Sequence, residues 1–132
     1  MAVELDVELV SPEEVTYSGK AEMVIVRTVE EGDIAFCAGH VPFLGVLAPW
    51  SVDVLRAGGG RDTFAVHRGF VEVSHNKVTI LSDVSEAADE IDTARAEAAR
   101  QGAVEALAAD ATDAEAAAAL ERAELRQRVA TA

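Results

Sequence analysis

Five residues in the second part of the chain combine charge and spacing in a way that suits ligand chemistry. Asp92 and Arg95 lie three residues apart directly after Ile91, and Arg122 and Arg126 lie four residues apart. On a helix such residues are neighbours, so the simplest interpretation of Asp92 and Arg95 is an intrahelical ion pair of about 0.2–0.5 kcal/mol. The alternative is a nucleotide site. There, Ile91 and Asp92 would hold an adenine ring, and the three arginines would hold phosphates.

The other reactive residues form no catalytic or metal-binding pattern. Cys37 and His40 lie three residues apart in an expected turn, where a structural thiol is favoured over a nucleophile pair. His40, His67 and His75 lack cysteine or carboxylate companions at the spacing of zinc ligands. The glycines of "RAGGGRD" lack the Lys-Ser/Thr ending of a phosphate-binding loop and indicate a hairpin turn. We therefore expect no metal site, no catalytic residue and no enzyme activity.

Charge and composition exclude several classes of partner. The chain has 132 residues and a formal net charge of −13, which disfavours nucleic acid and anionic lipid and favours a basic protein partner. A single cysteine rules out an internal disulfide and suggests a reducing compartment. No signal peptide is recognisable, and no apolar run reaches the roughly 18 residues of a membrane-spanning helix. Direct membrane insertion is therefore not expected.

The elements that must position these residues fall into two parts. Residues 1–85 contain all three prolines, all six aromatic residues and eight of the nine glycines. Hydrophobic residues alternate there with period two, as in Val3, Leu5, Val7 and Leu9, and turn residues such as His75-Asn76 interrupt them. This pattern predicts an N-terminal antiparallel β-sandwich or β-barrel domain, and the family resemblance given below implies the β-sandwich.

Residues 86–132 predict a C-terminal α-helical hairpin, which makes the fold class α+β. Alanine, the best helix former, accounts for 19 of these 47 residues. We expect Asp89 to cap the first helix, and Thr112 with Glu115 to form a capping box for the second. Because large apolar side chains are few, the hairpin should bury little area and hold its folded pose weakly.

Three stretches of the chain carry a family resemblance. "EEGDIAFCAGHVPFLGVLAPW", "FAVHRGFVEVSHNKVTILSD" and "IDTARA" occur in this order. They resemble segments of the ε-subunit family of bacterial F-type ATP synthases, where G-H-x-P and I/L-D-x-x-R-A motifs recur. Ala35 and Ala38 replace a common glycine and a common proline of the first segment.

The resemblance implies a non-catalytic subunit of the central stalk. In that family the sandwich contacts the γ subunit and the c-subunit ring. The hairpin either folds onto the sandwich or extends into the catalytic α/β head and blocks ATP hydrolysis. The location implied is peripheral, at the cytoplasmic face of the cell membrane.

The resemblance also implies regulatory ATP binding in some members, with no cofactor required. Glu86 joins the nucleotide candidates, because ATP-binding relatives place an acidic contact just before the first helix. Gly102 stands where such relatives often carry a basic residue, which would weaken a phosphate clamp. Whether ATP binds here, or the helix start contains only an ion pair, stays open at this point.

An acidic turn and a histidine are the candidates for docking. The residues alone indicate a solvated turn at Glu31, Gly32 and Asp33. The resemblance indicates instead a loop that docks on the ring. His40 is either a turn histidine bonded to backbone or a contact with γ. The hydrophobic residues that follow it are expected in the sandwich core: Phe43, Leu44, Val46 and Leu47.

A function of another class also fits the residues. The sandwich would be a stand-alone protein-binding module, and the acidic helices would serve only for oligomerisation. Co-purification with a γ subunit and a catalytic head would separate this alternative from a stalk subunit.

Overall fold

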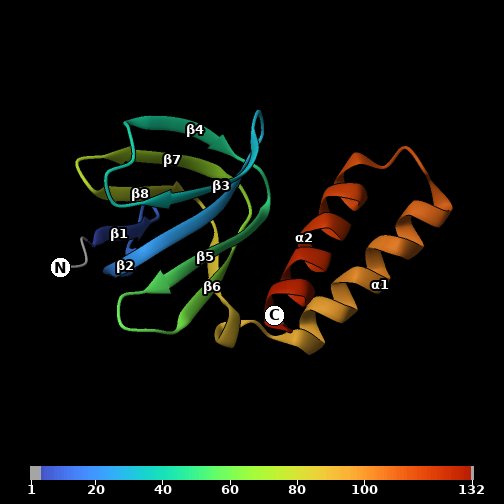
Figure 1. The fold of residues 1–132 in the computed structure, drawn as a ribbon. Helices are drawn as coiled ribbons and strands as arrows, with labels where there is room; N and C mark the ends of the chain where they lie inside the picture. The colour runs from blue at the N-terminus through green and yellow to red at the C-terminus, as the bar shows by residue number, and fades with distance from the viewer. Residues whose placement is uncertain (1–3, 132) are drawn as a thin grey trace.

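A computed structural model describes residues 4–131 and has two parts, a β-sandwich and a two-helix hairpin (Figure 1). The nine strands are β1 (Leu5–Val10), β2 (Val15–Thr28), β3 (Gly32–Cys37), β4 (Phe43–Leu47), β5 (Trp50–Arg56), β6 (Arg61–Val66), β7 (Gly69–Ser74), β8 (Lys77–Ser82) and β9 (Ser85–Ala87). A 3₁₀ turn, η1 (Ala88–Glu90), leads to α1 (Thr93–Ala109) and α2 (Ala114–Ala130). The predicted α+β class, with a β-sandwich followed by a helical hairpin, is confirmed.

The long strand β2 joins the two layers of the sandwich. Its first half pairs with β1, and its second half lies between β3 and β5. The remaining strands follow in the order β1-β8-β7-β4 on one side and β5-β6-β9 on the other. The pairs are antiparallel except β1 with β8, which are parallel. An antiparallel sandwich was predicted, and this one parallel pair departs from it. Alternation of hydrophobic and polar residues cannot reveal the direction of pairing, because it is the same in parallel and antiparallel pairs.

The core lies between the layers and follows the predicted alternation. Leu5, Val7 and Leu9 of β1 are buried, as predicted, while Val3 lies outside the described residues. The largest fully buried side chain is Phe36 of β3. The predicted turn at His75 and Asn76 is also present, with φ of 51° and 58° at the two residues, as a two-residue hairpin of type I′ requires.

The helices begin at residues other than those predicted. Asp92, not Asp89, is the N-cap of α1, because its backbone is extended and its side chain accepts a hydrogen bond from the Arg95 N–H. Asp113 caps α2 in the same way, through the N–H of Ala116. Thr112 instead bonds to Asp110, so the predicted Thr112–Glu115 capping box is absent. A three-residue turn, η1, occupies the place of the predicted first helical turn.

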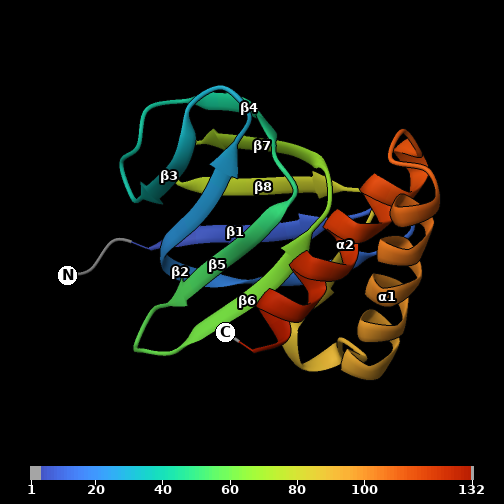
Figure 2. The ribbon, with the colours of Figure 1, turned by 90° about the vertical axis from the view of Figure 1, so that its right-hand side faces the viewer.

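The hairpin lies against one end of the sandwich through α2, with α1 on the outside (Figures 1 and 2). A small cluster, separate from the main core, joins the parts, in which Leu125 and Val129 of α2 pack on Ile91 and on Ala65 of β6. The division expected at residues 85 and 86 falls within β9, which pairs with β6 and belongs to the sheet. The independence of the two domains stays a prediction.

Candidate functional site

Glu86 is the centre of a polar cluster where the hairpin meets the sandwich. Its Oε1 accepts hydrogen bonds from Arg126 Nε of α2 at 2.7 Å and from His67 Nε2 at 3.0 Å. The side chains of Arg126 and Glu86 are 28% and 29% exposed, so the ion pair is partly withdrawn from water. Partly buried, hydrogen-bonded pairs of this kind contribute more than fully exposed ones. The cluster therefore attaches α2 to β9.

Burial sets the protonation of this cluster. It lowers the pKa of His67 below the usual histidine value, and the charges of nearby Arg126 and Arg122 add to this effect, whereas the hydrogen bond that His67 donates to Glu86 opposes it. Among the described residues, His67 Nδ1 is the one buried side-chain nitrogen or oxygen without a hydrogen-bond partner. Burial acts to raise the pKa of Glu86, but the hydrogen bonds from Arg126 and His67 outweigh it, so that pKa is lowered. Near neutral pH the cluster thus contains a neutral histidine, a carboxylate and a guanidinium.

Asp92 and Arg95 meet through the backbone and not through their charges. Asp92 Oδ1 accepts from the Arg95 backbone N–H at 3.0 Å, which is the N-cap bond. Within residues 4–131 the Arg95 guanidinium forms no ion pair with Asp92, so the predicted intrahelical ion pair is wrong. As the N-cap, the Asp92 carboxylate accepts from a backbone N–H that has no partner within the helix. The exposed Arg95 side chain remains available to a ligand.

The other nucleotide candidates have partners in this pose. Arg122 pairs with Glu115 at 3.0 Å, Arg126 pairs with Glu86, and Ile91 is only 9% exposed within the small apolar cluster. A bound nucleotide would therefore have to compete with two carboxylates for its arginines. ATP binding stays a prediction.

The acidic turn is held by its neighbours in β2. Asp33 lies opposite Arg27 in the ladder of β2 and β3, and Arg27 Nε donates to its Oδ1 at 2.7 Å. This hydrogen bond lowers the pKa of Asp33, with a smaller contribution from the charge of Arg128. Thr28 Oγ1 accepts from the Glu31 N–H at 3.0 Å, and Gly32 has a φ of +72°. The turn is thus a defined, exposed, acidic feature, and its role in docking stays a prediction.

His40 has close partners within the sandwich. Its Nδ1 lies 2.7 Å from the carbonyl oxygen of Val41, and its ring packs edge-on against Phe36 at 4.9 Å between centroids. This geometry suits the interpretation of a turn histidine bonded to backbone. A contact with γ stays a prediction for this half-buried residue.

An exposed apolar surface is the feature that sequence reasoning missed. Leu44 and Val46 of β4 are 70% and 50% exposed, so their expected place in the core is wrong, whereas Leu47 is buried and Phe43 is half-buried against the core. The strand alternates as predicted, but its outward face is also apolar. Alternation of hydrophobic and polar residues could not reveal this, because β4 has no polar residue to mark its outer side.

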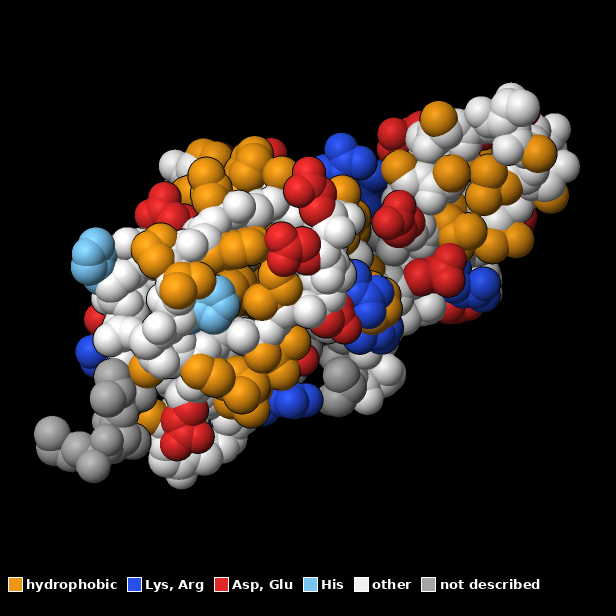
Figure 3. Space-filling view, turned by 45° about the horizontal axis from the view of Figure 1, so that its top comes forward, with side chains coloured by type: hydrophobic (Ala, Val, Ile, Leu, Met, Phe, Trp, Pro, Cys, Tyr) orange, Lys and Arg blue, Asp and Glu red, His pale blue; other side chains and the backbone are white. Residues whose placement is uncertain are grey.

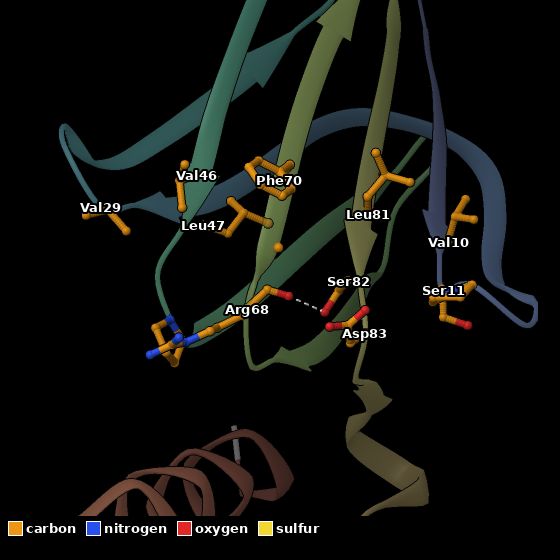
Figure 4. Close-up of a pocket in the computed structure, with 13 residues that line it drawn as sticks. Val10, Ser11, Val29, Val46, Leu47, Arg68, Phe70, Leu81, Ser82 and Asp83 are labelled. Atoms are coloured by element: carbon orange, nitrogen blue, oxygen red, sulfur yellow. Dashed lines mark hydrogen bonds between the residues drawn. The ribbon is translucent and has the colours of Figure 1, made fainter. Parts of the chain in front are cut away.

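Cross-strand pairing places Val46 at one end of a continuous row of apolar side chains. Val46 lies opposite Phe70, Phe70 opposite Leu81, and Leu81 opposite Val10, across β4, β7, β8 and β1. Figure 4 shows these four side chains, here called the apolar row, along the wall of a depression of about 840 Å³. Figure 3 shows hydrophobic side chains gathered on the surface of the sandwich, with carboxylates at their margin.

The described residues contain no cluster of three or more histidine, cysteine or carboxylate side chains able to hold a metal ion. No helix among residues 4–131 is long and apolar enough to cross a membrane.

Sequence comparison places the sandwich in a known family. Residues 4–88 match the family described as ATP synthase, Delta/Epsilon chain, beta-sandwich domain. The ATP synthase epsilon chain of Streptomyces griseus is 44% identical over 97 residues, which cover 74% of this chain and 77% of the relative. That of Thermobifida fusca is 46% identical over 104 residues, which cover 75% and 74%.

Solved structures give the same result for the whole fold. One chain of the Euglena gracilis mitochondrial ATP synthase, in a structure of OSCP/F1/c-ring in rotational state 1, matches with a TM-score of 0.81 and 25% identity. The match covers 95% of this chain and 80% of that one. A chain of the Tetrahymena thermophila central stalk and c-ring matches in fold, with a TM-score of 0.53, 19% identity and coverage of 68% and 71%.

Proposed function

This chain belongs to the ATP synthase delta/epsilon family, and from that premise we propose that it is a rotor subunit of the central stalk. In this role it links the membrane ring to the catalytic head and regulates ATP hydrolysis through its hairpin. The assignment makes it a non-catalytic subunit. Its partners are the γ subunit, the c-subunit ring and the α/β head, as the rotor assemblies that contain its structural neighbour suggest.

The apolar row is the observation that carries this proposal. Exposed apolar side chains that form a contiguous surface usually mark a protein interface. Phe70 is 52% exposed and Leu81 is 47% exposed, in the middle of a row that crosses four strands. The row needs a partner with a complementary apolar face. We assign that partner as γ, since the family's sandwich domain lies beside γ in the rotor.

The acidic turn supplies the second contact, with the ring. Glu31 and Asp33 are both exposed, and their charges suit polar or basic loops of the c subunits. Charge complementarity at such a rim sets the orientation and the association rate more than the affinity. The ion pair with Arg27 fixes the direction in which the Asp33 carboxylate points.

The hairpin supplies the regulation. Its attachment to the sandwich consists of a small apolar cluster and a few polar contacts, including Arg126 with Glu86 and Arg128 with Ser51. An element with so few buried contacts opens at a low free-energy cost. ATP bound by Asp92, Arg95 and Arg126 would stabilise the folded pose by mass action, and so restrain the extended, inhibitory pose.

The location that follows from this function is peripheral, at the cytoplasmic face of the cell membrane. Attachment through γ and the ring needs no apolar helix of the chain's own.

Co-purification with γ from native membranes tests the proposal. The tagged chain should retain γ and the α/β head, whereas Phe70→Glu should lose them, because a carboxylate would be buried in the interface. Val104→Glu is the matched control, since Val104 is 44% exposed on α1, away from the apolar row. A chain that retains neither γ nor the head, but associates with itself, would instead support the stand-alone binding module.

A further inference from the structure

The indole ring of Trp50 lies between two guanidinium groups from different parts of the fold. The Cζ of Arg27 in β2 is 3.4 Å from the ring centroid, and the Cζ of Arg128 in α2 is 3.6 Å from it. Two guanidinium groups at these heights would collide on one face of the ring, so they occupy opposite faces. Trp50 therefore contacts the sandwich on one side and the hairpin on the other.

Each arginine is held by a second contact. Arg128 lies in the last turn of α2, and its Nη1 donates to Ser51 Oγ at 3.2 Å. Arg27 donates to both oxygens of Asp33, through Nε at 2.7 Å and Nη2 at 3.3 Å. A continuous path of contacts thus runs from the acidic turn, through Arg27 and Trp50, to the end of α2.

Asp33 is the carboxylate bonded directly to this path, and Glu121 and Glu124 of α2 line the same depression without an ion pair to either arginine among the described residues. Two cations face each other through one ring, and the carboxylate of Asp33 offsets their repulsion. The pKa of Asp33 is lowered by the Arg27 hydrogen bond first and by the charge of Arg128 as well, so the carboxylate responds to both arginines. Within the described residues, Asp33 is the carboxylate that pairs with either of them.

We propose that Trp50 couples the hairpin to the acidic turn, so that engagement of Asp33 by a cationic side chain of a partner weakens the docking of α2. When a partner neutralises Asp33, the repulsion between Arg27 and Arg128 is no longer offset, and Arg128 leaves the ring more easily. The coupling is reciprocal, because docked α2 strengthens the Asp33–Arg27 pair and opposes the partner. This inference rests on the proposed function for the identity of the partner, the c-subunit ring, but the path itself lies within this chain.

The size of the effect follows from the contact involved. An exposed cation–π contact contributes enough to shift an equilibrium about two- to fivefold. Loss of Asp33 should therefore raise the open population of the hairpin by up to that factor, and the hairpin should remain mostly docked. The other attachments, at Glu86 and in the small apolar cluster, are unaffected.

Amide hydrogen exchange in α2 of the isolated full-length chain tests the coupling. Asp33→Asn should speed exchange in α2 by about two- to fivefold, although within the described residues Asp33 forms no hydrogen bond or ion pair with Trp50 or α2. The same change in an Arg27→Ala background should have a clearly smaller effect, because the repelling cation is gone and only the attraction between Asp33 and Arg128 is lost. Asp62→Asn is the matched control, since Asp62 pairs with Arg56 at 2.6 Å across the strands β5 and β6.

Trp50 is the chain's one tryptophan, so its fluorescence gives a second readout. Arg128→Ala should make Trp50 more accessible to acrylamide quenching, and Asp33→Asn should do so to a smaller extent. The coupling is refuted if Asp33→Asn leaves exchange in α2 unchanged, or if it acts equally with and without Arg27. Because no partner subunit is present in either measurement, that result would leave co-purification with γ, and thus the proposed function, untouched.

Discussion

Arg126 Nε and Glu86 Oε1 lie 2.7 Å apart although 40 residues separate them in the chain. Arg122, one turn earlier on the same helix, pairs instead with Glu115 of that helix. Arg126 therefore joins the hairpin to the sandwich, as Arg128 also does, whereas Arg122 pairs within the hairpin.

Arg126→Ala should loosen the hairpin far more than Arg122→Ala. Removal of Arg126 leaves a half-buried carboxylate with one fewer partner, at a cost of about 1–3 kcal/mol to docking. Removal of Arg122 breaks an exposed pair within the hairpin, worth about 0.2–1 kcal/mol at most. Proteolysis of α2 in the intact chain measures the difference. Equal rates for the two variants would show that the Glu86 cluster does not attach the hairpin.

Mild acid should destabilise the protein through His67. Its folded pKa is lowered, so the unfolded chain takes up a proton near pH 6.5 while folded His67 stays neutral. Stability is therefore present above pH 6.5 and declines as the pH falls from there to the folded pKa. Glu86, whose pKa is also lowered, should add a further loss below about pH 4.5.

Melting temperatures between pH 7.5 and 5.5 measure this effect. His67→Gln retains a donor for Glu86 but cannot titrate, so its melting temperature should change less over that interval. His75→Gln, at an exposed turn, should leave the wild-type slope unchanged. A slope that is the same in all three proteins would assign the titration to another group.

ATP should bind the isolated chain and raise its melting temperature. Each charge-assisted phosphate contact contributes about 1.5–3 kcal/mol, so Arg95→Ala or Arg126→Ala should weaken binding roughly tenfold to a hundredfold. Asp92→Ala should impair adenine binding, but it also removes the cap of α1. Asp92→Asn separates these effects, because asparagine caps a helix equally well and lacks the charge.

Calorimetric titration with ATP measures the binding, and magnesium should not be required, since the arginines would meet the phosphates directly. A chain that neither releases heat nor melts higher at millimolar ATP would have a purely mechanical hairpin.

Asp33→Lys should weaken the coupling of proton flow to ATP synthesis in reconstituted vesicles, because it places a cation where the proposed contact with the c-subunit ring uses a carboxylate. The fold should survive, since Asp33 is exposed. Glu105→Lys makes the same charge change on the exposed face of α1 and should leave coupling unchanged. If Asp33→Lys couples as well as the wild type, Asp33 is a solvated turn residue.

Two glycine substitutions should act in opposite directions on stability. A Cβ at Gly69 would lie 2.0 Å from the carbonyl oxygen of Leu81, so Gly69→Ala must shift the β7–β8 pairing and should lower stability by several kcal/mol, on the order of 3. A Cβ at Gly102 in α1 meets nothing within 4 Å, so Gly102→Ala should raise helix stability by about 0.5–1 kcal/mol. Urea unfolding of both variants measures these changes.

The sequence predicted the two-part fold because each part has its own periodicity. Alternation in β1 and the alanine content after residue 86 are local signals. The first agrees with the burial of Leu5, Val7 and Leu9, and the second with the helices α1 and α2. Helix starts were less predictable. Asp89, Asp92 and Asp113 are equivalent as capping residues, and the choice among them depends on where β9 and η1 end the sheet.

The contacts at the candidate sites could be predicted only in part. Arg27 with Asp33 and Arg128 with Trp50 depend on which strands and helices become neighbours, which a list of residues does not contain. Arg126 was expected to bind phosphate, and its position beside Glu86 follows from the docking of α2 on β9. The apolar row was missed because its members come from four strands and share a face only after pairing.

The short strand β9 limits the sheet edge that becomes exposed when the hairpin leaves the sandwich. β9 pairs with Phe64, Ala65 and Val66 and forms an edge of the sheet. An exposed edge strand can recruit another chain and so begin aggregation, and short or charged edges resist this. β9 has three residues, and the stretch of β6 that it leaves uncovered begins with Arg61 and Asp62. A rotor with an extended hairpin would thus offer other proteins almost no backbone to pair with at this edge.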